Sequence, residues 1–296
     1  MRTTRFAAEA ALVVAALLYG VTFPLVHDAL DDITPFAYIA GRFGIALLFV
    51  LPAAIRASRR IADRRLLLRV GAVTGAILFA GYATQTVGLQ YTSPSTSAFI
   101  TGLYVVITPV IEGIAFRRLP ERAVWIGIVL ATLGLYLLTG ANVHLGRGEL
   151  LTLACAVLFA VHIVYLGLYV HRLPPPTYTA MQLGMVALLA LPAVAAQGVG
   201  TLTALAVFAV AFTGIACSAI ALPLQVWGQL RIPPSRAALI LLAEPVFAGI
   251  ASYFTGERLG AEQLAGAAVI LVGIAVSEIG SARRAQARAE GAVPGT

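Results

Sequence analysis

Two charged side chains stand deep inside apolar stretches of the chain. Arg42 lies about 11 Å from one end of its stretch at ~1.5 Å per helical residue, and Glu244 lies at a similar depth in another. An arginine near the centre of a membrane helix costs about 2.5–3.5 kcal/mol, so it needs a partner. Either Arg42 is structural, bonding helix-end carbonyls or extending to the interface, or it balances an anion such as a substrate carboxylate or Glu244.

Glu244 directly precedes Pro245, which deprives the carbonyl of Leu241 of its usual donor and predicts a kink. Pro24 and Pro109 are further candidate kinks. A kink suits a gate and is equally compatible with a static bend. For Glu244 we favour a structural or gating role with a bonded carboxylate over proton coupling, because a buried carboxylate is costly unless paired. Proton antiport is the alternative.

A polar stripe marks the stretch near 95–116. Ser97, Thr101, Tyr104, Thr108 and Glu112 follow one another at helical spacing and share one face. Such a stripe normally faces a bundle interior or a wet cavity, although Ser and Thr also bond preceding carbonyls of their own helix. We expect a cavity wall here, with Glu112 close enough to the membrane interface to be solvated.

Other candidate lining residues lie at mid-depth. His162 and Tyr165 share one side of their helix, and the histidine either senses pH, pairs with a carboxylate or is simply hydrogen-bonded. The amides of Gln85 and Gln225 either bind a zwitterion or tie helices together. The remaining candidates for substrate binding are Tyr19, Thr22, Phe23, Phe79 and Tyr82.

Enzyme signatures are missing from the sequence. It has no H-E-x-x-H, no G-x-S-x-G, no pair of aspartates in apolar segments and no phosphate-binding loop. Both cysteines, Cys155 and Cys217, fall in apolar runs and support neither a disulfide framework nor a metal site. We therefore expect neither an enzyme nor a bound cofactor or metal.

The composition places these residues in a lipid bilayer. The 296 residues are 60% hydrophobic and 11% charged, with a mean hydropathy of +0.92, which no single water-soluble core accommodates. We expect an all-α integral membrane protein with ten transmembrane helices near 7–28, 35–54, 69–91, 95–116, 122–139, 149–170, 176–197, 202–230, 237–255 and 261–279. The loops are too short for a soluble domain, and 281–296 is predicted to be a disordered cytoplasmic tail.

The chain also repeats itself at an offset of 140 residues. Glu9 matches Glu149, each expected to begin a helix where the dipole favours a carboxylate. Further matches are Pro35/Pro175, Gly44/Gly184, Gln85/Gln225 and Pro94/Pro234. The units are 1–140 and 141–280, and five crossings in each require inverted repeats, the architecture of alternating access. Paired glycines seven residues apart predict close helix packing: Gly127, Gly134, Gly266 and Gly273.

Orientation follows from arginine, because the chain has no lysine. Seventeen of its 20 basic residues fall on the side of the termini in this ten-helix layout. Both termini are therefore expected in the cytoplasm. The net charge of +7 is explained by this topology and does not indicate nucleic-acid binding.

The whole chain resembles the drug/metabolite transporter superfamily, specifically ten-helix exporters built from two EamA-type units. The resemblance rests on the TSAFITGL run at 96–103 leading to Thr108-Pro109, on AEPV at 243–246 followed by GERL at 256–259, and on the paired glycines. Among characterised members it is most similar to YddG-type amino-acid exporters. The first unit has Arg118-Leu119 where the second has Glu257-Arg258-Leu259, so any role of that glutamate belongs to one half.

The resemblance implies a monomeric carrier of the bacterial inner membrane that exports amino acids or related small metabolites by alternating access. Its cavity is expected between helices 1, 3, 4, 6, 8 and 9, where Tyr19, Phe23, Phe79 and Tyr104 would suit aromatic or apolar substrates. Export of drugs or other metabolites by proton antiport is the alternative. A channel and an intramembrane enzyme rank below both.

Overall fold

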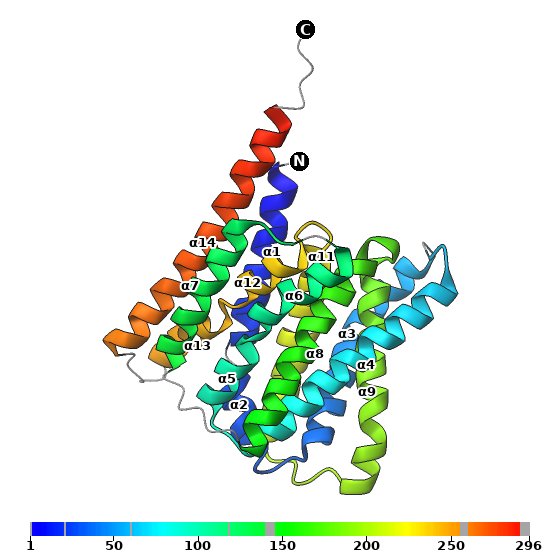
Figure 1. The fold of residues 1–296 in the computed structure, drawn as a ribbon. Coiled ribbons are helices and arrows are strands. Elements are labelled where there is room, and N and C mark those ends of the chain that lie inside the picture. The colour runs from blue at the N-terminus through cyan, green and yellow to red at the C-terminus, as the bar shows by residue number, and fades with distance from the viewer. Residues whose placement is uncertain are drawn as a thin grey trace.

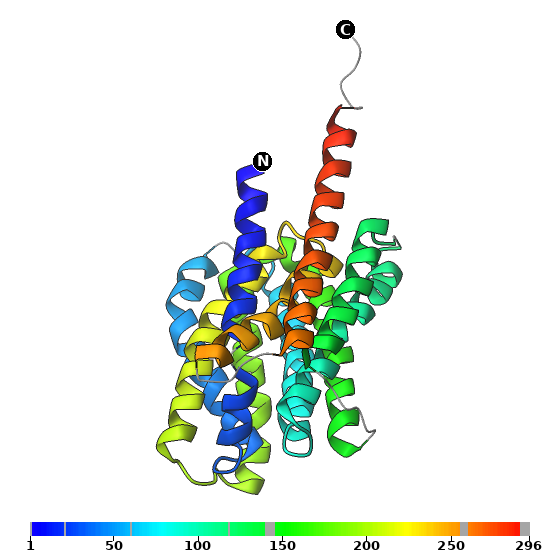
Figure 2. The same cartoon turned by 90° about the vertical axis from the view of Figure 1, so that its left-hand side faces the viewer.

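The computed structural model describes residues 2–20, 22–59, 61–117, 119–139, 146–254 and 260–290. Within these ranges the chain consists of helices and their connections, with no strand. The helices form one bundle, and α1 begins on the same side of it as α14 ends (Figure 1 and, turned by 90°, Figure 2). The predicted all-helical class is therefore confirmed.

The helices follow the expected segments closely. In the first half they are α1 (Arg2–Gly20), α2 (Thr22–Ala29), α3 (Pro35–Ser58), α4 (Arg64–Gly88), α5 (Pro94–Gly102), α6 (Tyr104–Phe116) and α7 (Arg122–Thr139). In the second half they are α8 (Arg147–Tyr169), the 3-10 turn η1 (Val170–Arg172), α9 (Pro175–Gln197), α10 (Ala204–Phe212), the π-helix η2 (Thr213–Ala221), α11 (Leu222–Gly228), α12 (Pro234–Leu241), α13 (Glu244–Phe254) and α14 (Ala261–Glu290).

Seven helical stretches in the described chain are long and apolar enough to cross a membrane, and an eighth, Arg122–Leu138, is apolar but shorter. The expected first and ninth segments are not among them as continuous helices. The first is divided into α1 and α2, and the ninth into α12 and α13. With the shorter eighth stretch counted, these two segments make up the difference from ten.

Proline sets the start of four helices. Pro35, Pro94, Pro175 and Pro234 are the first residues of α3, α5, α9 and α12. Proline suits this position because its φ is already helical and its missing N–H has no partner in the first turn. The two pairs of prolines are 140 residues apart, so the corresponding helices of the two halves begin at equivalent positions.

Helices break at corresponding places in both halves. The α-helix that begins at Pro94 ends at Gly102 and resumes at Tyr104, and the one that begins at Pro234 ends at Leu241 and resumes at Glu244. Pro245 follows the second break immediately, where a proline cannot supply the hydrogen bond of a continuous helix. Pro109 lies further on, inside α6.

Two expectations about the ends of helices were wrong. The predicted disordered tail, 281–296, is helical as far as Glu290, because α14 continues through the sequence SARRAQARAE, which is rich in strong helix formers; residues 291–296 lie outside the described part. Glu9 does not begin a helix, since α1 starts at Arg2. Its counterpart Glu149 does, and its carboxylate accepts a hydrogen bond from the backbone of Gly146 at 3.0 Å.

Glycines join α7 to α14 by direct backbone contact. A Cβ added at Gly127 would stand 2.6 Å from the carbonyl oxygen of Gly273, and one added at Gly134 would stand 2.6 Å from that of Gly266. The same distance recurs from Gly273 to the Gly127 oxygen and from Gly266 to the Gly134 oxygen. The contact is therefore reciprocal between the two helices.

Reciprocal contacts also link α3 and α4 with their counterparts in the second half. The hydroxyl of Tyr38 on α3 donates to Thr213 at 2.8 Å, and the hydroxyl of Tyr178 on α9 lies 2.7 Å from that of Thr74 on α4. Tyr38 and Tyr178 are 140 residues apart. Each half thus contributes a tyrosine that bonds a threonine of the other half.

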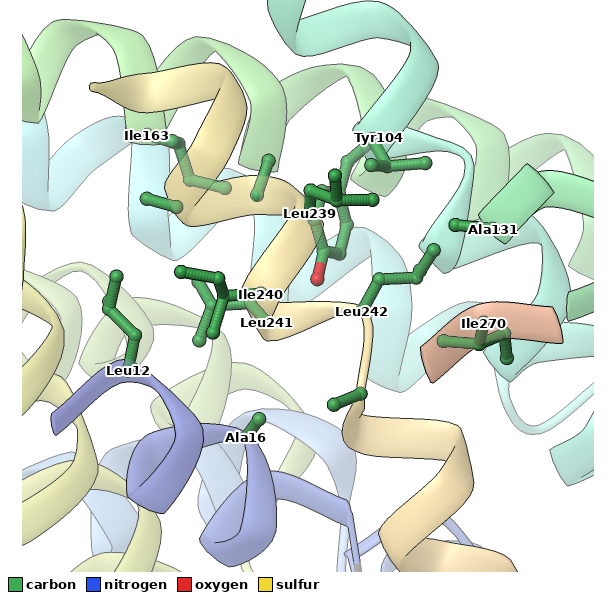
Figure 3. Packing of buried hydrophobic residues seen from close by; sticks show 14 of the residues in the cluster. Leu12, Ala16, Tyr104, Ala131, Ile163, Leu239, Ile240, Leu241, Leu242 and Ile270 are labelled. Carbon is green, nitrogen blue, oxygen red and sulfur yellow. The ribbon is translucent and has the colours of Figure 1, made fainter. Parts of the chain in front are cut away.

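The half-helix α12 forms the centre of the largest apolar cluster. All eight of its residues are buried, and Leu239, Leu241 and Leu242 pack among side chains of α1, α6, α7 and α8 (Figure 3). It lies in the half of the bundle nearer the termini, whereas α5 lies in the other half (Figure 1). On α5, Pro94, Ala98 and Phe99 keep partial exposure.

Candidate solute-binding site

A cavity lies where the broken helices meet the rest of the bundle. It leaves about 90 Å³ for the centres of water-sized molecules, room for several waters. Polar and aromatic side chains make up most of its wall. They are Tyr19, Thr22, Tyr38, Arg42, Tyr82, Gln85, Thr86, Thr101, Tyr104, Phe159, His162, Gln225 and Glu244.

Arg42 is the fixed positive charge of this wall. It is 4% exposed, and its Nε donates to Ser218 Oγ at 2.8 Å. Nη1 and Nη2 donate to the hydroxyls of Tyr38 at 3.4 Å and Tyr82 at 3.2 Å. The guanidinium carbon also stands 4.6 Å from the centroid of the Tyr82 ring, so Arg42 is held by neutral hydroxyls and aromatic rings.

Neither partner expected for Arg42 is bonded to it. Within the described part of the chain it makes no ion pair with a carboxylate, and its hydrogen bonds there are to side-chain hydroxyls rather than to helix-end carbonyls. Hydroxyls orient a guanidinium without neutralising it. Arg42 therefore has no counter-charge at ion-pair distance among the described residues.

The π-helix η2 brings Ser218 to Arg42. A π-helix bonds each residue to the fifth one along and is found frequently at functional sites. Its Gly214 lies against the backbone of α3, where an added Cβ would stand 2.9 Å from the Arg42 carbonyl oxygen. The close approach of α3 and η2 is what allows a serine hydroxyl to reach the guanidinium.

Glu244 is the acidic group of the wall. It is the first residue of α13, where the helix dipole favours a negative charge. It interacts electrostatically with Arg42 but does not form an ion pair with it. Among the described residues no hydrogen-bond partner is found for its carboxylate either.

The family of the chain follows from comparison with known proteins. The model of the EamA-like transporter family matches residues 7–140 and, a second time, residues 146–278. The chain belongs to the EamA-like transporter family. EamA-like membership makes it a transporter rather than an enzyme.

Relatives agree with this assignment, and a solved structure shares the fold. An "Uncharacterized transporter" of Archaeoglobus fulgidus is 34% identical, with 92% of this chain and 86% of the relative covered. The "Uncharacterized transporter YyaM" of Bacillus subtilis is 26% identical over 88% of this chain and 89% of its own. A crystal structure 20% identical in sequence superposes with a TM-score of 0.80, covering 93% of this chain and 98% of the other.

In this EamA-like transporter, most of the predicted binding residues line one cavity. The structure brings together Tyr19, Thr22, Arg42, Tyr82, Gln85, Thr101, Tyr104, His162, Gln225 and Glu244. Several are bonded to one another or to nearby polar groups. Tyr19 donates to Gln225 at 3.2 Å, and Gln85 donates to Thr101 at 3.3 Å.

The remaining predicted residues lie elsewhere. Phe79 packs in an apolar cluster next to Phe36, and the Tyr165 ring lies tilted against that of Tyr169, with 4.9 Å between their centroids. Thr108 is buried and bonds the Tyr104 carbonyl at 2.6 Å, the local alternative open to any helical threonine. The side chains of Phe23 and Pro24, like residues 255–259 with the GER motif, lie outside the described part.

His162 forms a hydrogen bond within the wall of the cavity. It is 2% exposed, and its Nε2 lies 2.8 Å from Oε1 of Gln182. Because an amide oxygen only accepts, Nε2 carries the hydrogen in this contact. Gln182 is the residue that corresponds to Arg42 at the 140-residue offset, so the second half holds a neutral pair where the first holds a charge.

Glu112 has a different role from the one expected. Instead of being solvated at the interface, its Oε2 accepts a hydrogen bond from the backbone of Ser235 at 2.7 Å and another from the Ser235 hydroxyl. It therefore caps the N-terminus of α12. Sequence reasoning also missed Tyr38 and Ser218. Tyr38 lies one turn before Arg42, a signal that spacing could have given.

Proposed function

We propose that this EamA-like protein carries small solutes with a carboxylate group, amino acids among them, across the bilayer. The observation that supports this is the buried Arg42, which faces the cavity with neutral hydroxyl partners and no carboxylate partner in the described chain. A buried charge is costly until it is paired. A solute carboxylate would supply the missing pair through the planar guanidinium.

The mechanism we propose is alternating access by ten membrane helices in two inverted five-helix repeats, 1–140 and 141–280. Three observations support it: the family model matches the chain twice, the break between α5 and α6 recurs between α12 and α13, and the glycine and tyrosine contacts are reciprocal. Repeats of opposite orientation can pack in two similar ways, each opening the centre to a different face.

The substrates and orientation are part of the same proposal. Tyr19, Tyr104 and Phe159 offer aromatic surface in the cavity, which supports amino acids with aromatic or apolar side chains, moved in the direction of export. The arginine distribution supports the bacterial inner membrane with both termini in the cytoplasm. A functional monomer is part of the proposal, because both repeats that line the cavity belong to the same chain.

Counterflow in proteoliposomes tests the proposal. Vesicles loaded with one unlabelled amino acid should take up its labelled form, and Arg42→Gln should raise the KM by about 10-fold or more, as expected when a charged hydrogen bond of about 1.5–3 kcal/mol is lost. Arg172→Gln is the matched control, because Arg172 lies over the Tyr169 ring outside the cavity. Uptake of cationic drugs with no uptake of any carboxylated solute would refute the proposal.

A further inference from the structure

We infer that Glu244 binds the ammonium group of the solute, so that the cavity selects zwitterions over solutes with a carboxylate alone. This inference rests on the proposed function and adds a specificity residue to it. Arg42 alone explains why an anion enters. It does not explain why an acidic side chain lines the same cavity.

The first step is that both charged groups have unused capacity. A guanidinium has five N–H donors, and the bonds of Arg42 in the described chain are to Ser218, Tyr38 and Tyr82. The carboxylate of Glu244 has neither an ion pair nor a hydrogen bond with any described residue. A basic and an acidic side chain therefore line one cavity without a direct bond between them.

The second step is that Glu244 is held in place. Gly20, the last residue of α1, packs so closely that an added Cβ would stand 2.6 Å from the Glu244 carbonyl oxygen. The start of α13 is thereby fixed against α1. The backbone dipole at the start of a helix also favours the ionised form of a carboxyl group.

The third step concerns the rings beside Glu244. Tyr19 and Tyr104 line the same cavity and interact electrostatically with the carboxylate. Aromatic rings attract ammonium groups through their faces. A cavity lined by an acid, an arginine and several tyrosines fits a solute that carries both charges.

A pair of matched solutes tests the inference: an apolar amino acid and the 2-hydroxy acid that has the same side chain. In counterflow the unmodified protein should prefer the amino acid by at least about tenfold, since a polar site rejects an analogue that leaves it unpaired. Glu244→Gln should remove most of this preference while still moving the hydroxy acid. Glu262→Gln, on the exposed first turn of α14, is the matched control, and melting temperatures in detergent verify folding.

The outcomes separate the two proposals. If the unmodified protein moves the hydroxy acid as well as the amino acid, or if folded Glu244→Gln keeps the preference, the inference is wrong and the carboxylate carrier stands. If neither solute moves, the proposed function itself is wrong. A third outcome, in which Glu244→Gln keeps the preference but loses its response to a pH gradient, assigns the residue to proton exchange and also overturns the inference.

Discussion

Removing Arg236 should loosen the face of the bundle nearer the termini. Arg236 lies on the buried half-helix α12, and its Nη2 donates to Glu9 on α1 at 3.1 Å. Its Nε donates to Glu278 on α14 at 2.8 Å, and Nη2 donates to the second oxygen of Glu278. One guanidinium thus joins three helices around the apolar cluster.

The size of the effect follows from these contacts. A hydrogen bond to a charged group contributes about 1.5–3 kcal/mol, and breaking a fully buried pair costs about 3–5 kcal/mol. Here Glu9 and Glu278 are 26% and 20% exposed, so water replaces part of the loss. We expect Arg236→Gln to favour opening of this face by about 2 kcal/mol, or ~30-fold in the open-to-closed ratio.

Thiol labelling measures this ratio. With Cys155→Ala and Cys217→Ser as background, Ala16→Cys places one thiol in the buried cluster, where Ala16 is 0% exposed. A membrane-impermeant maleimide added to the face that carries the termini should label Ala16→Cys about 30-fold faster when Arg236→Gln is added. Arg231→Gln is the control, because Arg231 lies over the Trp227 ring on the surface.

Equal labelling rates with Arg236→Gln and Arg231→Gln would refute this reasoning. The three-helix contact would then contribute nothing to closure. Faster labelling from the opposite face alone would refute it as well, because α12 would not be the element that closes the side of the termini.

Two further predictions concern packing and the orientation of Arg42. Gly134→Ala should lower the melting temperature in detergent by a few degrees, since overpacking costs about 1–3 kcal/mol. Gly44→Ala should not, because the space around Gly44 is open. Equal melting temperatures of the two variants would contradict the close contact of Gly134 with Gly266. Ser218→Ala should raise the KM for a carboxylated solute several-fold with little change in kcat, because it removes the 2.8 Å bond that orients Arg42. An unchanged KM would show that Tyr38 and Tyr82 are enough to orient Arg42.

The helices were predictable because their signals are local. Apolar runs of spanning length and prolines at helix starts place most segments within a few residues of the observed ones. The break before Pro245 was predictable for the same reason, since the missing donor belongs to the proline itself. Helix propensity was underestimated in the tail, where alanine and arginine extend α14 to Glu290.

The partners of charged residues were not predictable, because they come from distant parts of the chain. Glu9 bonds Arg236, which lies 227 residues away, and nothing near Glu9 indicates this contact. The partners of Arg42 include Ser218, and the π-helix that presents it has no sequence marker in TGIACSAIA. Depth alone identified Arg42 and Glu244 as candidates, whereas their relation to each other required the structure.

Tyr38 and Tyr178 show that a nearly symmetric framework can carry an asymmetric charge. Each bonds a threonine of the other half, but Tyr38 also accepts a bond from Arg42, whereas at the equivalent position Gln182 pairs with His162. Under the proposed mechanism, a solute held by its carboxylate at Arg42 would keep one orientation whichever face of the protein is open. It would leave with its carboxylate leading through one face and trailing through the other, so the two release steps would have different barriers even if the two protein conformations were equal in energy.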